Sequence, residues 1–188
     1  KKNGRKVASF GEQYHYPGAP SNTKEIPAAF TKLIDKIHAT DGFKDAAINQ
    51  VVINEYAGSG SHLPEHSDDE PEIRTNSLIF GITVGSTMPL IFRDKCGGQE
   101  EELVPANGSL YTMKQESQYY WSHRIDTPTE DVVLRHSITL RSIGANHKNS
   151  LVILGDSNTK HLKFGTGEKG TFGYLVPGKR VETFHLRQ

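Results

Sequence analysis

Residues 132–141 read Val-Val-Leu-Arg-His-Ser-Ile-Thr-Leu-Arg, a stretch in which apolar and polar side chains alternate. Successive side chains of an extended strand point to opposite faces, so this alternation predicts a β-strand with two different faces. Two arginines that face the interior imply a bound dicarboxylate or matching Asp or Glu, because a buried unpaired guanidinium is costly. The alternative is an exposed basic face on an edge strand. One face carries Arg135, Ser137, Thr139 and Arg141, and the other carries Leu134, His136, Ile138 and Leu140.

Around this strand, residues 42–143 form short runs rich in Val, Ile, Leu, Phe and Tyr, separated by Gly, Pro, Asn and Asp clusters. This pattern is typical of a mainly β domain and favours closure as a jelly roll or barrel. Apolar residues at helical spacing between Ile26 and Ile37 predict one amphipathic helix that packs against a sheet, giving a mainly β, α+β class. Strands are expected at residues 48–56, 77–82, 90–93, 108–113, 119–125 and 132–141.

The composition bounds the function classes. The chain has 188 residues, with 22 Lys plus Arg and 22 Asp plus Glu, so its formal net charge is +0. This balance excludes a general electrostatic pull toward nucleic acid or anionic membrane, and any polyanion must be held by a local patch. No apolar run approaches the roughly 18 residues of a membrane span. The lone Cys96 excludes an intrachain disulfide, and the missing initiator Met suggests a piece of a longer chain.

A second segment carries metal-binding side chains at two-residue spacing. Residues 54–56 read Asn-Glu-Tyr, and residues 66–70 read His-Ser-Asp-Asp-Glu. Residues i and i+2 of an extended chain share a face, so Asn54 points with Tyr56, and His66 with Asp68. One imidazole and one carboxylate suit a divalent metal, and a distant second His would complete the ligand set of non-haem Fe(II) oxygenases. The alternative is a surface His near acidic residues.

The strand expected at residues 119–125 offers that second imidazole. It contains the sequence Trp121-Ser122-His123, in an aromatic context. Together with His66 and Asp68, His123 would give a site of two histidines and one carboxylate. The alternative is a core histidine whose ring binds a backbone carbonyl.

Together these motifs resemble the AlkB family of Fe(II)- and 2-oxoglutarate-dependent dioxygenases. The resemblance spans about residues 2–143 and implies a double-stranded β-helix of the cupin-like, jelly-roll type. Residues 6–11 and the Tyr14-x-Tyr16-x-Gly18 motif look like the nucleotide-recognition lid of members that repair alkylated bases. Residues 66–70 look like versions in plant RNA virus AlkB domains and in a nuclear animal repair enzyme. The matching motifs are Asn54-x-Tyr56, His66-x-Asp68, His123 and Arg135-x-Ser137-x-Thr139-x-Arg141.

The resemblance implies an enzyme with Fe(II) as its metal and with 2-oxoglutarate and dioxygen as co-substrates. His66, Asp68 and His123 would be both the metal ligands and the catalytic residues. The implied reaction is oxidative demethylation of N-alkylated bases such as 1-methyladenine and 3-methylcytosine. It is coupled to the decarboxylation of 2-oxoglutarate to succinate and releases formaldehyde.

The resemblance also implies how 2-oxoglutarate is held. Arg135 would bind its distal carboxylate as a bidentate fork, with hydrogen bonds added by Tyr56 and Ser137. Asn54 and Arg141 would serve the carboxylate next to the keto group. The family has Asn as well as Ser at the position of Ser137.

A methylated base cannot reach the metal inside a duplex, so it must be flipped out or unpaired and then stacked between flat side chains. The resemblance implies that Tyr16 and the His66 ring form this stack, with Tyr14 nearby. Glu70 would read the exocyclic amine or stabilise a cationic lesion, whereas Asp69 should face solvent. The alternative for the two tyrosines is ordinary sheet packing.

The expected partner is methylated RNA or single-stranded DNA, bound by a monomer. The expected location is intracellular, in the cytoplasm or nucleus, with a viral or mobile-element polyprotein as one context for the chain. The basic start, with Lys2, Arg5 and Lys6, would contact phosphates, and so would Arg124. Two alternatives remain open at this point. One is a dioxygenase of the same superfamily that acts on a small molecule or protein, and the other is a non-catalytic nucleic-acid-binding module.

The tail differs from the rest of the chain. Residues 151–158 read Leu-Val-Ile-Leu-Gly-Asp-Ser-Asn and resemble the first block of SGNH esterases, with Ser157 at the nucleophile position. That family places its Asp-x-x-His motif near the end of a much longer domain, and this chain has no such motif before Gln188. We therefore expect residues 1–145 to form the dioxygenase-like domain. Residues 146–188 are expected to be a tail, either the truncated start of an SGNH-like domain or an extension that covers the barrel.

Overall fold

The computed structural model describes residues 4–13, 24–58, 60–126 and 134–144, together with the backbone of residues 172–174 and 182–184. The chain divides into two compact units, Lys1–Gly144 and Ala145–Gln188. In the second unit, β10 (Phe172–Tyr174) pairs antiparallel with β11 (Glu182–Phe184). The two-domain division at residue 145 and the SGNH-like tail stay predictions, and Ser157 lies outside the described residues.

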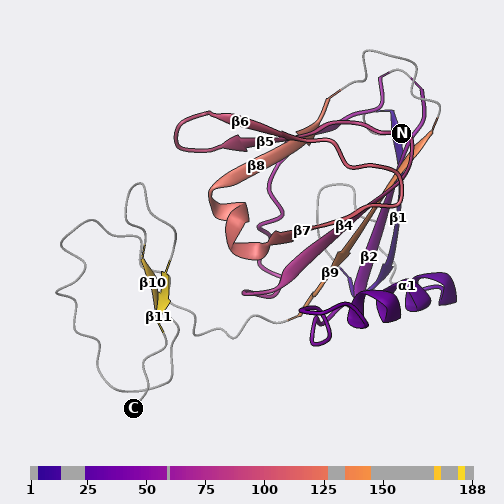
Figure 1. The fold of residues 1–188 in the computed structure, drawn as a ribbon, viewed down its shortest axis with the longest axis horizontal. Coiled ribbons are helices and arrows are strands. Elements are labelled where there is room, and N and C mark those ends of the chain that lie inside the picture. The colour runs from indigo at the N-terminus through magenta and orange to yellow at the C-terminus, as the bar shows by residue number, and fades with distance from the viewer. Residues whose placement is uncertain are drawn as a thin grey trace. The chain divides into compact units, whose positions relative to one another are not determined.

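The first unit is built from two antiparallel sheets (Figure 1), which confirms the predicted mainly β class. Strands distant in sequence are neighbours in both sheets, as a jelly roll requires. The five-stranded sheet has the order β1 (Arg5–Gly11), β2 (Gln50–Tyr56), β9 (Arg135–Arg141), β4 (Leu78–Gly85) and β7 (Leu110–Lys114). The four-stranded sheet has the order β3 (Leu63–His66), β8 (Trp121–Ile125), β5 (Leu90–Asp94) and β6 (Glu100–Leu103).

The position of β9 decides where its arginines point. This strand lies between β2 and β4, so both of its edges are paired. Arg135 is 0% exposed and Arg141 is 7% exposed, while Leu140, on the opposite face, belongs to the apolar core. The predicted alternation is therefore confirmed. The alternative of an exposed basic face on an edge strand is wrong, because β9 is a central strand.

A single amphipathic helix, α1 (Ala28–His38), covers the outer face of the five-stranded sheet, at the bottom of Figure 1. It begins two residues later than Ile26, because Pro27 occupies the N-cap and its carbonyl accepts the N–H of Phe30 at 2.8 Å. Ile34 and Ile37 are its buried residues. No helix in the described part of the chain has the length and apolar character needed to cross a bilayer.

Three strands depart from the expected pattern. β6 carries the sequence Glu-Glu-Glu-Leu with every residue exposed. Backbone pairing with β5 holds this strand in the sheet, and its sequence has no apolar alternation from which a strand could be predicted. β3 is four residues long and has mixed burial. The strand expected from residue 119 begins instead at Trp121, because residues 115–119 form the 3₁₀ helix η1 (Gln115–Tyr119).

Phe80 on β4 is the centre of the core beneath α1. Its side chain is 0% exposed and meets Phe43 edge-on, with the ring centroids 5.2 Å apart. Phe80→Ala is expected to lower the free energy of unfolding by about 3–5 kcal/mol, because it removes a buried ring and leaves a cavity. Urea unfolding measures this loss. Tyr119→Ala, on a side chain that is 49% exposed, is the control, and an equal loss in both variants would contradict this account of the core.

Candidate metal and co-substrate site

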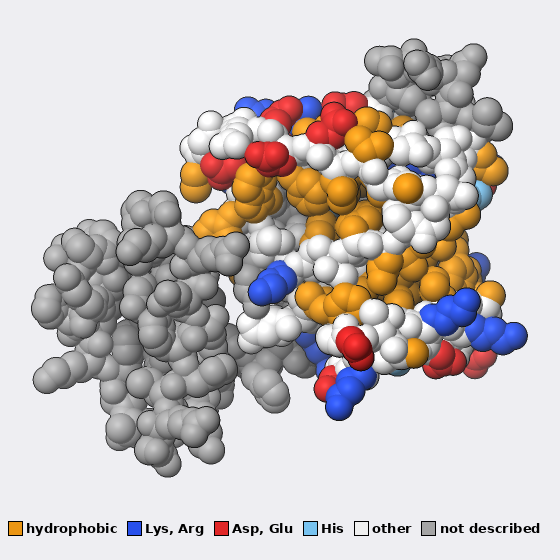
Figure 2. Space-filling model, in the orientation of Figure 1, with side chains coloured by type: hydrophobic (Ala, Val, Ile, Leu, Met, Phe, Trp, Pro, Cys, Tyr) orange, Lys and Arg blue, Asp and Glu red, His pale blue; other side chains and the backbone are white. Residues whose placement is uncertain are grey.

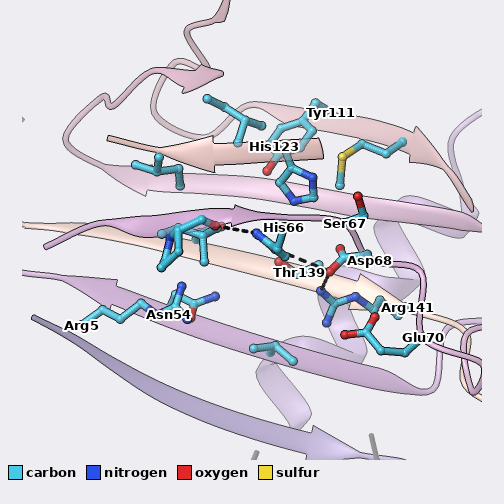
Figure 3. A pocket seen from close by; sticks show the side chains of 17 residues that line it. Arg5, Asn54, His66, Ser67, Asp68, Glu70, Tyr111, His123, Thr139 and Arg141 are labelled. Carbon is cyan, nitrogen blue, oxygen red and sulfur yellow. Dashed lines mark hydrogen bonds and ion pairs between the residues drawn. The ribbon is translucent and has the colours of Figure 1, made fainter. Parts of the chain in front are cut away.

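The three predicted metal ligands meet between the two sheets (Figure 3). His66 ends β3, Asp68 follows two residues later, and His123 lies in β8. The β3–β8 pairing sets His66 opposite His123, with the ring centroids 4.3 Å apart. One ligand atom from each residue lies within 4.8 Å of the other two. A single ion can therefore contact all three side chains.

Contacts with the backbone orient the segment that carries these ligands. His66 Nδ1 lies 2.9 Å from the carbonyl oxygen of Pro64, and His66 Nε2 lies 3.8 Å from Asp68 Oδ1. A carbonyl bound to one ring nitrogen fixes the tautomer of an imidazole ligand and leaves the other nitrogen for the metal. Ser67 Oγ donates to the carbonyl oxygen of Trp121 at 3.0 Å. This bond ties the ligand segment to β8.

His123 differs from the core histidine that was the alternative. No backbone carbonyl of the described residues accepts a hydrogen bond from its ring. Its ring lies beside His66, with Phe92 behind it at a centroid distance of 5.9 Å. The side chain is 5% exposed and lines the same cavity as Asp68. His123 therefore points into the ligand cluster.

Arg141 is the counter-ion of Asp68. Its Nη2 donates to Asp68 Oδ1 at 2.7 Å, and both side chains are buried. Burial would raise the pKa of Asp68, but Arg141, His123 and His66 outweigh it and lower this pKa to about 2. The pKa of His123 is lowered to about 4, mainly by burial and secondly by the nearby His66. At neutral pH the site thus presents an anionic carboxylate and a neutral His123 imidazole, the forms that bind metals.

The buried side chain of Gln118, in η1, supports the ligand segment. Its Oε1 accepts the backbone N–H of Asp68 at 3.0 Å, and the residue is 2% exposed. Sequence reasoning missed Gln118, because its role depends on where η1 packs and no local pattern reports that. A buried N–H that loses its acceptor costs about 1–3 kcal/mol.

Gln118→Met is expected to weaken metal binding by roughly tenfold, because the apolar side chain fills the same volume but cannot accept the Asp68 N–H. Titration of the protein with Mn(II) measures the dissociation constant. Gln115→Met is the matched control, since Gln115 is also buried in η1 but bonds to the Tyr119 hydroxyl, at 3.3 Å. Equal weakening in both variants would point to a general effect of η1 on folding.

Arg135 and Tyr56 form a buried pair that lacks an anion. The Arg135 Cζ lies 5.1 Å from the centroid of the Tyr56 ring, and both residues are 0% exposed. Arg135 Nη2 donates to Thr83 Oγ1 at 3.2 Å, but its Nε and Nη1 have no hydrogen-bond partner among the described residues, and neither has the Tyr56 hydroxyl. A buried guanidinium requires an anionic acceptor. The distal carboxylate of 2-oxoglutarate would supply one, so these residues fit the co-substrate that the resemblance implies.

A cavity of about 330 Å³ adjoins the ligand cluster. Of the residues predicted to hold 2-oxoglutarate, Asn54, Ser137 and Arg141 line it, whereas Tyr56 and Arg135, both 0% exposed, are not among its lining residues. Tyr111 of β7, which sequence reasoning missed, lines the cavity and packs against the apolar cluster that contains Tyr56. In a strand as short as β7, the alternation of side chains between two faces does not reveal which of them face the interior.

The predicted substrate residues divide into three groups. Arg5 and Glu70 line the cavity (Figure 3), and Asp69 is exposed, as expected. Lys6 does not reach the cavity: it points to the opposite face of the sheet and pairs with Glu55 at 2.6 Å. Tyr14, Tyr16 and Lys2 lie outside the described residues, so the nucleotide-recognition lid stays a prediction.

The expected phosphate contact of Arg124 is not supported, because carboxylates already hold this guanidinium. Its Nη1 and Nη2 donate to Glu100 at 2.7 and 3.1 Å, and its Nε donates to Asp126 at 2.9 Å. Figure 2 shows acidic and basic side chains gathered over the upper part of the molecule, where β5, β6 and β8 lie. These pairs brace the outer face of the four-stranded sheet.

Curated relatives of the chain include proteins named "DNA oxidative demethylase ALKBH2". The Bos taurus protein is 24% identical over 165 residues, which cover 82% of this chain and 58% of that protein. The Homo sapiens protein is 26% identical over 150 residues, covering 74% of this chain and 56% of that protein. The chain thus spans less than two thirds of the length of these relatives.

The solved structure described as "The structure of OsALKBH1" has a TM-score of 0.57 and 18% identity, and the match covers 74% of this chain and 78% of that one. This likeness confirms the predicted jelly-roll fold. The family model described as "2OG-Fe(II) oxygenase superfamily" matches residues 3–150. The chain therefore belongs to the 2OG-Fe(II) oxygenase superfamily, as the AlkB resemblance predicts, and its cofactor is Fe(II), with 2-oxoglutarate and dioxygen as co-substrates.

Proposed function

We propose that this chain removes N-alkyl groups oxidatively from bases such as 1-methyladenine and 3-methylcytosine in RNA or single-stranded DNA. In the proposed reaction, dioxygen places one oxygen atom in succinate and the other on the N-methyl carbon. 2-Oxoglutarate loses carbon dioxide, the hydroxymethyl group leaves as formaldehyde, and the proton of its hydroxyl returns to the base nitrogen. The partner would be bound by a monomer in an intracellular compartment.

One observation carries this proposal: three metal-binding side chains line one cavity, and the same domain buries an arginine, Arg135, whose Nε and Nη1 have no partner among the described residues. His66, Asp68 and His123 would hold Fe(II), which when bound supplies the activation of dioxygen. Three protein ligands leave coordination positions open, which distinguishes a reactive metal from a structural one. The names of the ALKBH2 relatives, DNA oxidative demethylases, support the alkylated-base substrate.

The remaining polar residues would orient the co-substrate. Arg135 and Tyr56 would bind the distal carboxylate, since their donors are buried and lack an anion. Asn54 and Ser137 line the cavity between that pair and the ligand cluster. Arg141 donates to Asp68 and lines the cavity, where it would serve the carboxylate next to the keto group.

An alkylated base would enter the cavity from its mouth, after it is flipped out or unpaired. Glu70 lines the cavity, and its Oε2 is buried without a hydrogen-bond partner among the described residues. An anionic oxygen there would favour a cationic lesion over a neutral base, through charge and through a hydrogen bond to the exocyclic amine. Arg5 lines the same cavity and would meet a backbone phosphate.

The proposal is tested by loading the protein with Fe(II) and 2-oxoglutarate under anaerobic conditions and then admitting dioxygen. A panel of singly methylated RNA and DNA oligonucleotides is followed by mass analysis, with unmethylated oligonucleotides as controls. A loss of one methyl group from at least one oligonucleotide, with an equal amount of formaldehyde, is expected. Retention of the methyl group by every oligonucleotide would overturn the proposal.

A dioxygenase that acts on a small molecule or protein is the second candidate. It is favoured by charge pairing outside the cavity, since Lys6, Arg124 and Lys95 all have carboxylate neighbours. Such pairs reduce the positive surface that a polyanion would bind. Succinate production discriminates the two candidates: stimulation by methylated oligonucleotides supports demethylation, and turnover stimulated by other substrates alone supports the second candidate.

A further inference from the structure

A second cavity, of about 360 Å³, adjoins the first cavity, which contains the metal ligands. Met113 and His123 line both cavities, so a ligand in the second cavity would lie close to the metal site. The remaining lining residues come from β5, β6, β7 and β8 and from η1. The proposed function assigns no ligand to this second cavity.

Aromatic side chains line the second cavity along the four-stranded sheet. The β5–β8 pairing sets Phe92 opposite His123, and their ring centroids are 5.9 Å apart. Trp121 precedes His123 by two residues, so the two side chains share a face of β8, and Trp121 also lines the cavity. Aromatic side chains of this kind stack on the face of any nucleobase. A planar ring therefore fits this part of the cavity.

Two charged side chains, Glu101 of β6 and Lys114 of β7, also line the second cavity. The β5–β6 pairing sets Glu101 opposite Phe92, which places its carboxylate next to the aromatic rings. Glu101 accepts a hydrogen bond from Gln99 at 2.9 Å, and neither charged side chain forms an ion pair with a described residue. A carboxylate and an ammonium group on separate strands are complementary to a ligand that carries one charge of each sign.

We propose that the second cavity binds a nucleotide whose base is cationic because it is N-alkylated. The base would stack on Trp121 and Phe92 with its positive charge beside Glu101, and its phosphate would meet Lys114. This inference rests on the proposed function, from which it takes the class of base. Demethylation removes the positive charge of such a base, so the second cavity would hold the alkylated nucleotide more tightly than the repaired one.

Tryptophan fluorescence tests this inference, because the chain has one tryptophan, Trp121. The probe is 1-methyladenosine 5′-monophosphate, and adenosine 5′-monophosphate, whose base is neutral, is the comparison. Both are titrated into the anaerobic, Fe(II)-loaded protein with 2-oxoglutarate, in which no turnover occurs. Both should quench the fluorescence of Trp121, and the alkylated nucleotide should bind about fivefold more tightly, the effect of one ion pair at a partly exposed site.

Glu101→Gln should weaken binding of the alkylated nucleotide by about fivefold and leave binding of adenosine 5′-monophosphate unchanged, because only the alkylated base carries a charge that Glu101 can meet. Glu102→Gln is the matched control. It removes the same charge from the next residue of β6, whose side chain points to the opposite face of the strand, and it should bind both nucleotides as the wild type does. Lys114→Gln should weaken both nucleotides alike.

Absence of quenching by 1-methyladenosine 5′-monophosphate would overturn the inference, and so would equal effects of Glu101→Gln and Glu102→Gln. Quenching that is weakened by Glu70→Gln, in the first cavity, but not by Glu101→Gln would place the nucleotide in the first cavity and would overturn it as well. Demethylation of oligonucleotides without this quenching would leave the proposed function standing and remove the second site alone. Quenching without any demethylation would overturn the proposed function and leave the second cavity as a site for cationic nucleotides.

Discussion

Asp68→Asn is expected to abolish formaldehyde release and to weaken Fe(II) binding by at least about a hundredfold, since changes merely next to a ligand already cost roughly 10–100-fold. The asparagine keeps the shape of the side chain and the backbone N–H that bonds to Gln118. It removes the negative charge that binds the metal and that pairs with Arg141 at 2.7 Å. Anaerobic titration with Fe(II) measures the affinity, and formaldehyde release measures turnover.

Asp69→Asn is the matched control for this prediction, because Asp69 is the next residue and its side chain is 49% exposed. It should retain both metal affinity and turnover. Binding of a methylated oligonucleotide by Asp68→Asn separates two further possibilities. Retained affinity with lost turnover fits a catalyst, whereas wild-type formaldehyde release in Asp68→Asn would show that the metal is held elsewhere.

Arg135→Met should raise the dissociation constant of 2-oxoglutarate by at least about thirtyfold, because truncating one member of a buried charge pair costs about 2–5 kcal/mol. The physical cause is the loss of the cation in a layer that is 0% exposed and has no protein carboxylate within hydrogen-bonding distance among the described residues. Calorimetry on the anaerobic, Fe(II)-loaded protein measures this constant.

The same variant makes a second, opposite prediction for the protein without ligand. Methionine fills a similar volume without a buried charge, so the melting temperature of Arg135→Met should equal or exceed that of the wild type. Arg93→Met, on a side chain that is 49% exposed, is the control and should change neither quantity. A strongly lowered melting temperature in Arg135→Met would show that Arg135 serves to hold the fold together.

Much of the fold was predictable because alternation is a local property. The two faces of β9 follow from side chains that are polar and apolar in turn, and burial of Arg135 and Leu140 on opposite faces confirms them. β6 was not predictable, because an exposed Glu-rich strand is held by backbone pairing that any sequence can make. The start of the strand at Trp121 was missed because η1 precedes it and aromatic residues continue across the boundary.

The candidate site, like the fold, was predictable from the sequence only in part. The sequence alone determined which residues could hold a metal ion, His66 and Asp68 on one short segment and His123 on another, because ligand types and two-residue spacing are local. Tertiary structure alone decided that β3 pairs with β8 so that the two rings meet, that Arg141 binds Asp68, and that Tyr111 lies over Gly81. These contacts join residues far apart in the chain, and strand register and sheet order, which no local pattern encodes, determine them.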